Sequence, residues 1–219
     1  MKILIAKDEA FNFIYRANVD WFKERCDVSF FSPLHDSRMP EADLLYLPGG
    51  YPELFFKEIG CNAGMLSEIK AFAEAGELVY AECGGFMYLC RSIDEAPMCG
   101  VLPFKATMQN ARLHLGYRQM RLSAINGTPL AARRNAEGTV LKGHEFHYSD
   151  VVDDGCFNTD EKTVSAGEQS TTVSKLCLQQ SAKGSDVATA LYAYKNVVAG
   201  YTHWYWAETG FPFFNDIRL

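Results

Sequence analysis

Cys83 has the sequence surroundings of a catalytic nucleophile. An apolar run, Leu78–Ala81, leads toward the cysteine, and Gly84 and Gly85 follow it before a helical pattern begins. This order is typical of a nucleophile elbow, a tight strand-to-helix turn that lifts one side chain above the edge of a sheet. Glycines there avoid collisions with neighbouring backbone, and N–H groups at a helix start lower a thiol pKa and bind an oxyanion. We therefore expect a nucleophile with a lowered pKa; the alternative is a small buried core residue.

His203 is the best candidate for the base that activates this thiol. It follows the last apolar run, 197–201, which we expect to be a strand. Because catalytic groups gather at the carboxyl ends of parallel strands, Cys83 and His203 are expected to meet in space although they lie far apart in the chain. His203 would take the thiol proton and return it to a leaving group. The alternative is a histidine packed among aromatic residues.

The four other histidines have weaker claims. His35 and His114 lie in polar or loop contexts, and His144 and His147 belong to the segment GHEFHYS. On a strand these last two side chains would point to opposite faces, so we expect no zinc site and no other metal site there. His144, Glu145 and His147 are instead expected to line a substrate or a partner interface, the alternative being a plain strand.

A glycine-rich loop, Pro48–Glu53, is a candidate for the second half of an oxyanion hole. Consecutive glycines let backbone N–H groups approach a ligand closely, so the N–H groups near Gly50 and Gly84 could bind an oxyanion together. Tyr51 is expected to contact substrate or a partner. The chain contains no GxxxxGK[ST] motif, which excludes a nucleotide-binding P-loop within it.

These residues require an α/β framework. In the first half, apolar strands alternate with helical patterns, which predicts a mainly parallel sheet with helices on both faces. The strands predicted there are 2–6, 27–31, 43–47 and 78–81, and the helices are 12–25, 63–75 and 84–90. The second half is richer in β-structure, with strands predicted near 116–122, 139–149, 171–177, 187–194 and 197–201. The polar stretch 153–170 is expected to be an exposed loop or hairpin. One domain over residues 1–219 accounts for this pattern.

Composition narrows the class of protein. The 219 residues carry a net charge of −6, which argues against a nucleic-acid or anionic-membrane surface. No apolar run is long enough for a membrane span or a signal peptide. Seven cysteines are scattered without a CxxC pair, which favours free thiols and a cytoplasmic location.

The motifs PGGYPE, AECGGFMYL, GHEFHYS and AGYTHWYW, in that order, closely resemble the C-terminal glutamine amidotransferase domain of cobyrinic acid a,c-diamide synthases. The opening IAKDEAFNF and the block LGYR resemble the same domain, so the similarity covers nearly the whole chain apart from 153–185. The resemblance implies a flavodoxin-like class I glutamine amidotransferase fold, with Cys83 as nucleophile and His203 as its partner.

The same resemblance raises a question about the catalytic acid. Ordinary class I amidotransferases place a glutamate two residues after the histidine, whereas this chain has Tyr205 there. The candidates to orient the histidine are therefore left open between Glu82, Glu145 and Glu208.

The resemblance also implies partners. Whole enzymes of this family carry an N-terminal P-loop synthetase domain that uses ATP and Mg²⁺ to activate a corrinoid carboxylate. We expect no cofactor in the present domain, which would be an excised domain or a split subunit that releases ammonia from glutamine. Related alternatives are a cobyric acid synthase, a nickel-sirohydrochlorin diamide synthase and a cell-wall amidotransferase. A flavodoxin-like cysteine hydrolase and a non-catalytic binding module are the alternatives from other classes.

Overall fold

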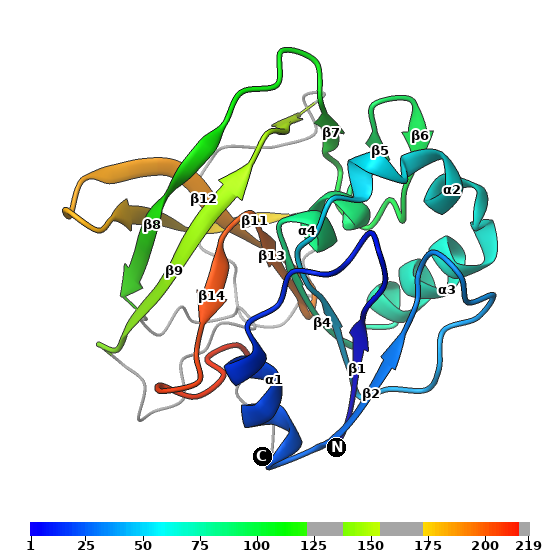
Figure 1. Ribbon diagram of the computed structural model, residues 1–219, viewed down its shortest axis with the longest axis horizontal. Helices are drawn as coiled ribbons and strands as arrows, with labels where there is room; N and C mark the ends of the chain where they lie inside the picture. Colours follow the sequence, from blue (N-terminus) through cyan, green and yellow to red (C-terminus); the bar gives the residue numbers. More distant parts are fainter. Residues whose placement is uncertain (122–137, 154–172, 215–219) are drawn as a thin grey trace.

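The computed structural model describes residues 1–121, 138–153 and 173–214. The strands are β1 (Lys2–Ala6), β2 (Asp27–Phe31), β3 (Leu44–Leu47), β4 (Leu78–Glu82), β5 (Ser92–Ile93), β6 (Ala96–Pro97), β7 (Lys105–Thr107), β8 (His114–Arg121), β9 (Val140–His147), β10 (Asp150–Val152), β11 (Ser174–Ser181), β12 (Asp186–Tyr194), β13 (Val197–Gly200) and β14 (His203–Tyr205). The helices are α1 (Arg16–Lys23), α2 (Phe56–Cys61), α3 (Ala63–Glu74) and α4 (Gly84–Leu89), with a 3-10 turn, η1, at Pro52–Leu54. Within the described ranges the large sheet has the order β14-β9-β8-β11-β12-β13-β4-β3-β1-β2, and a small sheet has the order β10-β7-β5-β6 (Figure 1).

The N-terminal half of the large sheet is parallel. Strands β2, β1, β3, β4 and β13 all pair in the parallel sense, and every residue of β3 and β13 is buried. Leu45 and Val79 pack into the cluster with α3 and α4, whereas Leu44 and Tyr80 pack with α1 and with aromatic residues between 204 and 214. Helices therefore cover both faces, as the sequence predicts, and the aromatic C-terminal segment completes the cover on the α1 side.

The other half of the sheet is antiparallel and brings the two parts of the chain together. Strands β12, β11, β8, β9 and β14 continue from β13 in the antiparallel sense. β14 begins only three residues after the last residue of β13, yet it pairs with β9 at the far end of the strand order. The sheet must therefore curve so that its β14 edge returns to the carboxyl end of β13, as Figure 1 allows the reader to follow.

Most predicted elements are present, with some corrections. The helix predicted over 12–25 begins only at Arg16, because the N–H of Phe13 donates to the carbonyl oxygen of Gly49 and ties this part of the chain to the glycine-rich loop. Helix α2, strand β14 and the small sheet were not predicted from the sequence. Residues 154–170, the greater part of the predicted polar loop, lie outside the described residues. In the described part of the chain, no helix is both long enough and apolar enough to cross a membrane.

Candidate active site

Cys83 occupies a strained turn between β4 and α4. Its backbone has φ 47° and ψ −105°, a conformation that residues other than glycine adopt only when the surrounding structure imposes it. The N–H of Cys83 donates to the Gly200 carbonyl oxygen at 2.8 Å, and its own carbonyl oxygen accepts from the Met87 N–H at 3.0 Å. Held from both sides in this way, the cysteine has the nucleophile-elbow geometry that its sequence surroundings predict.

The elbow requires glycines because there is no room for a side chain at these positions. A side chain at Gly85 would collide with the carbonyl group of Leu47 on β3. A Cβ atom at Gly84 would lie 2.7 Å from the ring of Pro52 and 3.1 Å from the nitrogen of Gly50. The elbow and the glycine-rich loop are therefore packed backbone against backbone, which is the reason for the glycines at these positions.

A cavity of about 270 Å³ opens at the cysteine. Its lining residues are Phe13, Gly50, Tyr51, Cys83, His144, Phe146 and His203. The structure thus brings the candidate nucleophile, the candidate base and the glycine-rich loop around one space, together with two residues of the GHEFHYS segment. Glu145 and His147, which were also predicted to contact substrate or a partner, do not line it.

The resting thiol is protonated, which corrects the sequence expectation of a lowered pKa. Burial raises the pKa of the Cys83 thiol to about 12, and the nearby carboxyl groups of Glu53 and Glu82 act in the same direction. The N–H groups of Gly84 and Gly50 oppose this effect but do not overcome it. The thiol donates a long hydrogen bond of 3.7 Å to a backbone carbonyl oxygen on β9.

The same two N–H groups are the ones that the sequence predicts for an oxyanion hole. Both the Gly50 and the Gly84 N–H interact with the sulfur of Cys83. The neighbouring N–H groups are engaged elsewhere, since Tyr51 donates to Ala10 and Gly85 donates to Pro48. Two donors that converge on a thiol in this way could bind the oxygen of a carbonyl group that the sulfur attacked.

His203 is held in the cavity by backbone contacts of β14. Asn18 of α1 is fully buried, donates to the Trp204 carbonyl oxygen at 2.8 Å and accepts from the Trp206 N–H at 3.0 Å. A side chain at Gly143 of β9 would collide with the carbonyl oxygen of His203, so this pair of strands approaches closely at the histidine. Helix α1 and strand β9 therefore fix the position of the His203 imidazole.

The imidazole of His203 is neutral and crowded. Burial lowers the pKa of His203 to about 3, and the neighbouring His144 and His147 add to this effect. Its ring stacks on that of His144, with centroids 4.9 Å apart, and meets Phe13 edge-on at 4.5 Å. A neutral imidazole is the form that can accept a proton from a thiol.

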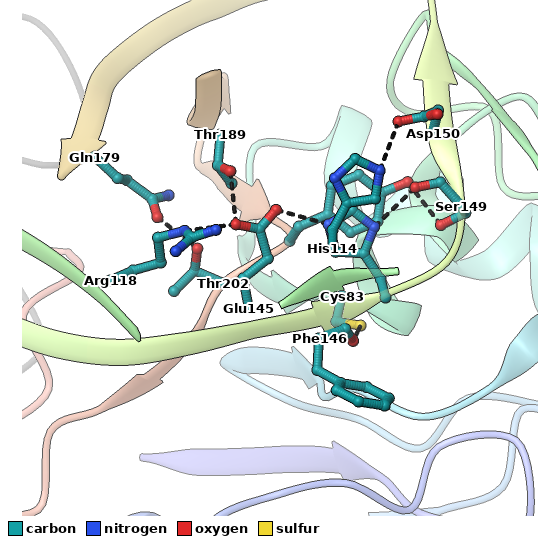
Figure 2. A network of polar contacts seen from close by, with 12 residues as sticks. Cys83, His114, Arg118, Glu145, Phe146, Ser149, Asp150, Gln179, Thr189 and Thr202 are labelled. Carbon is teal, nitrogen blue, oxygen red and sulfur yellow. Dashed lines mark hydrogen bonds and ion pairs between the residues drawn. The ribbon is translucent and has the colours of Figure 1, made fainter. Parts of the chain in front are cut away.

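Alternate side chains of β9 lie on opposite faces of the sheet. Figure 2 shows Glu145 and Phe146 leaving β9 on opposite sides, with Cys83 on the side of Phe146. His144 shares the cavity face, and its Nδ1 lies 2.6 Å from the hydroxyl of Tyr15. His147 lies on the other face with Glu145, so the two histidines of the segment point apart, as the strand geometry predicts.

The far face of β9 carries a buried ionic network. His114, Glu145 and His147 place one potential metal-ligand atom each within 4.8 Å of one another. The Glu145 carboxylate, however, already accepts from Arg118 at 2.6 Å and Thr189 at 2.7 Å, and it lies 2.7 Å from His147. The guanidinium beside it opposes a second cation, so we interpret these residues as a structural network that braces β8 against β9.

Two carboxyl groups lie near the site: Glu82, one of the three candidates to orient the histidine, and Glu53, to which sequence reasoning assigned no role. Glu82 lies directly before the nucleophile, and its Oε2 is 3.9 Å from Nδ1 of His203. Glu53, in the glycine-rich loop, lies close enough to Cys83 to affect the thiol pKa, and its Oε2 is buried without a hydrogen-bond partner among the described residues. Burial raises the pKa of Glu53. In the sequence, the only sign of a role for Glu82 or Glu53 was its position next to a candidate catalytic motif.

The fold is shared with a class of known structures. A glutamine amidotransferase of Thermotoga maritima has a similar structure, with a TM-score of 0.53 at 13% identity, over 92% of this chain and 75% of that one. The fold is that of the class I glutamine amidotransferases.

Sequence similarity identifies the family within this class. Residues 2–211 match the CobB/CobQ-like glutamine amidotransferase domain, and the chain belongs to this family. The cobyrinate a,c-diamide synthase of Methanosphaera stadtmanae is 39% identical over 160 residues, which cover 73% of this chain and 34% of the relative. The enzyme of the same name from Clostridium acetobutylicum is 38% identical over 205 residues, or 93% of this chain and 42% of the relative. The chain therefore spans between a third and a half of the length of these two relatives.

Proposed function

We propose that this chain releases ammonia from glutamine by covalent catalysis at Cys83. The observation that carries the proposal is that the strained cysteine and the neutral imidazole of His203 line one cavity, while the N–H groups of Gly50 and Gly84 converge on the cysteine sulfur. Acyl transfer needs a nucleophile, a base and oxyanion donors, and these residues supply all three. Membership of a glutamine amidotransferase family names the donor substrate.

The first step joins the sulfur to the substrate. His203 takes the thiol proton as the Cys83 sulfur attacks the carboxamide carbon of glutamine. Because burial keeps the thiol protonated and the imidazole neutral, no thiolate–imidazolium pair exists beforehand, and proton transfer accompanies attack. The carbonyl oxygen gains a negative charge, which the N–H groups of Gly50 and Gly84 stabilise.

The second step breaks the carbon–nitrogen bond and then restores the enzyme. His203 gives its proton to the departing nitrogen, so that ammonia leaves and a γ-glutamyl thioester remains on Cys83. A water molecule, deprotonated by His203, attacks the thioester carbon. The sulfur leaves, regains the proton, and glutamate is released.

The acceptor of the ammonia is also a proposal. The relatives are named cobyrinate a,c-diamide synthase, and this chain matches about a third of the length of the first and about two fifths of the second. We propose that a P-loop synthetase domain or subunit, using ATP and Mg²⁺, activates the a- and c-carboxylates of a corrinoid, which then take up the ammonia. We also propose a cytoplasmic location, in keeping with five free cysteines among the described residues.

Other acceptors use the same donor chemistry. A nickel-sirohydrochlorin diamide synthase, a cobyric acid synthase or a cell-wall amidotransferase would need the same site, and the named relatives favour the cobyrinate reaction over these. A cysteine hydrolase of the same fold would act without preference for glutamine. Competition by glutamine separates the amidotransferases from such a hydrolase.

The decisive experiment is labelling with a diazo-ketone analogue of glutamine, followed by peptide mass spectrometry. We expect one adduct on Cys83 that excess glutamine prevents, and none in Cys83→Ala, whose folding is checked by circular dichroism. Cys61→Ser, which removes an exposed thiol, is the matched control and should label normally. The experiment is repeated with the synthetase half added; an unlabelled Cys83 in both samples would reject the proposal.

A further inference from the structure

A catalytic histidine needs a partner for the ring nitrogen that does not face the reaction. That partner fixes the tautomer and the orientation of the ring, so that the other nitrogen carries a lone pair. In His203 the Nδ1 atom is buried and has no hydrogen-bond partner among the described residues. Tyr205, two residues further along β14, carries no carboxylate that could serve.

Glu82 is the carboxyl group that faces this nitrogen. Its Oε2 lies 3.9 Å from His203 Nδ1, and both side chains are almost completely buried. We propose that Glu82 is the positioning residue of His203, holding a proton on Nδ1 so that Nε2 stays free to act on Cys83. The inference rests on the proposed role of His203 as the base.

The Glu82 carboxylate is anchored, which suits it to this role. Its Oε1 accepts from the Tyr80 hydroxyl at 2.5 Å and from the Trp204 N–H at 2.8 Å, and its Oε2 accepts from the Tyr46 hydroxyl at 2.8 Å. A carboxylate oxygen has room for two such bonds, so Oε2 can still accept one from the imidazole. The bond from Trp204 also ties the carboxylate to the residue that follows the histidine.

The separation of 3.9 Å is too long for a hydrogen bond and describes the resting protein. Catalytic hydrogen bonds are often long before substrate binds and shorten in the reacting complex. Burial raises the pKa of Glu82 to about 7, while the imidazole stays neutral, so the two groups do not form an ion pair at rest. When His203 takes the thiol proton, an ionised Glu82 would attract the new positive charge and close the gap.

The other nearby groups do not replace Glu82. Glu145 lies on the far face of β9 and is saturated by its own ionic network, and Glu208 is exposed. His144 stacks on the imidazole ring, and the hydroxyls of Tyr46 and Tyr80 point at the carboxylate. His147 also interacts electrostatically with the imidazole, and Tyr15 and Cys83 interact with the carboxylate. None of these is a carboxylate that could accept from Nδ1.

The test is the tautomer of His203, read from the ¹⁵N–¹H correlation spectrum of its imidazole and assigned by loss of the signal in His203→Gln. We expect the Nδ1–H form in the wild-type chain. In Glu82→Gln the amide can donate to Nδ1, so the tautomer should change to Nε2–H and the glutaminase kcat should fall about 100-fold or more, with KM little changed. A wild-type protein in the Nε2–H form, or an unchanged tautomer in the variant, would overturn the proposal.

A second variant separates positioning from a purely structural role. Tyr205 lies on the same face of β14 as His203, so Tyr205→Glu places a carboxylate two residues after the histidine. Combined with Glu82→Gln, it should restore the Nδ1–H tautomer and part of kcat, which repair of a packing defect would not do. The inference fails alone if Cys83 and His203 prove essential while Glu82→Gln keeps full activity. The proposed function fails instead if Cys83 is never labelled, whatever the tautomer.

Discussion

His144 and His203 stack ring on ring across the β9–β14 pair, with centroids 4.9 Å apart and planes 18° apart. Burial lowers the pKa of both imidazoles, so both are neutral around pH 7. Both imidazoles line the cavity at Cys83, so their position alone does not decide which of them is the base for the thiol. The two histidines differ in the partner of Nδ1. Nδ1 of His144 lies 2.6 Å from the Tyr15 hydroxyl, whereas Nδ1 of His203 faces Glu82.

Substitution should separate the two histidines. We expect His203→Ala to lower glutaminase kcat by about 100-fold or more, the typical contribution of a general base. His144→Phe keeps an aromatic ring on the stack and should leave kcat within about tenfold, with the larger effect on KM. Steady-state kinetics with glutamine, and the rate of Cys83 labelling, measure both effects. If His144→Phe proved as inactive as His203→Ala, the result would contradict the assignment of His203 alone as the base.

The raised pKa of the thiol predicts an unusual pH dependence of alkylation. Since burial holds the pKa of Cys83 at about 12, the thiolate fraction grows roughly tenfold with each pH unit well below that value. The rate of modification by iodoacetamide, followed by mass spectrometry in the absence of glutamine, should therefore still be rising at about pH 9 to 10. The unfolded protein in denaturant is the control and should level off near the ordinary pKa of about 8.5. A plateau below pH 8 in the folded protein would reveal a preformed thiolate.

The sequence could bring Cys83 and His203 to one cavity because both signals are local. Cys83 follows a buried strand and precedes two glycines, and His203 follows another strand, so the rule that strand ends converge was sufficient. The parallel strands β1, β3, β4 and β13 could likewise be recognised as apolar runs, because they are buried. The small sheet was missed because strands of two or three residues, such as Ser92–Ile93, are too short to show a period.

The contacts that complete the site are not local. His144 reaches His203 only because the antiparallel half of the sheet curves back, and no spacing in the sequence encodes that curvature. The relation between Glu82 and His203 depends on β4 lying beside β13, which pairs Glu82 with Gly200. The error over the thiol pKa has a similar origin, since the helix-start effect was visible in the sequence whereas the depth of burial was not.

Gly49 offers a steric test of the base. A Cβ atom there would overlap the imidazole of His203, although the backbone of Gly49 does not lie in the left-handed region and would accept alanine. Gly49→Ala should therefore displace the ring, lowering kcat about 100-fold and stability by about 1 to 3 kcal/mol through overpacking. Gly64→Ala in α3 is the matched control: its Cβ would meet nothing closer than 3.5 Å, and it should be neutral or stabilising by up to about 1 kcal/mol. Equal behaviour of the two variants, by kinetics and by urea unfolding, would contradict this arrangement.

The ionic network on the far face of β9 should set the acid stability of the protein. Burial alone would raise the pKa of Glu145, but hydrogen bonds from His147 and Thr189 and the charge of Arg118 lower it to about 2, against 4.5 for a free glutamate. A carboxyl group whose pKa is lower in the folded state stabilises the protein above the unfolded value. That contribution is lost as the pH falls from about 4.5 through about 2.

Glu145→Gln should therefore cost stability at neutral pH and much less in acid. Removing one partner of a buried ion pair leaves the others uncompensated, which predicts a loss of about 3 kcal/mol at pH 7 in the free energy of unfolding by urea. The difference from wild type should shrink as the pH approaches 2. Glu24→Gln, which breaks an exposed ion pair with Arg25, is the control and should change stability by less than about 0.5 kcal/mol at any pH. If Glu145→Gln lost the same free energy at pH 7 and at pH 3, the effect would come from side-chain shape rather than charge, and the network would not be ionic in origin.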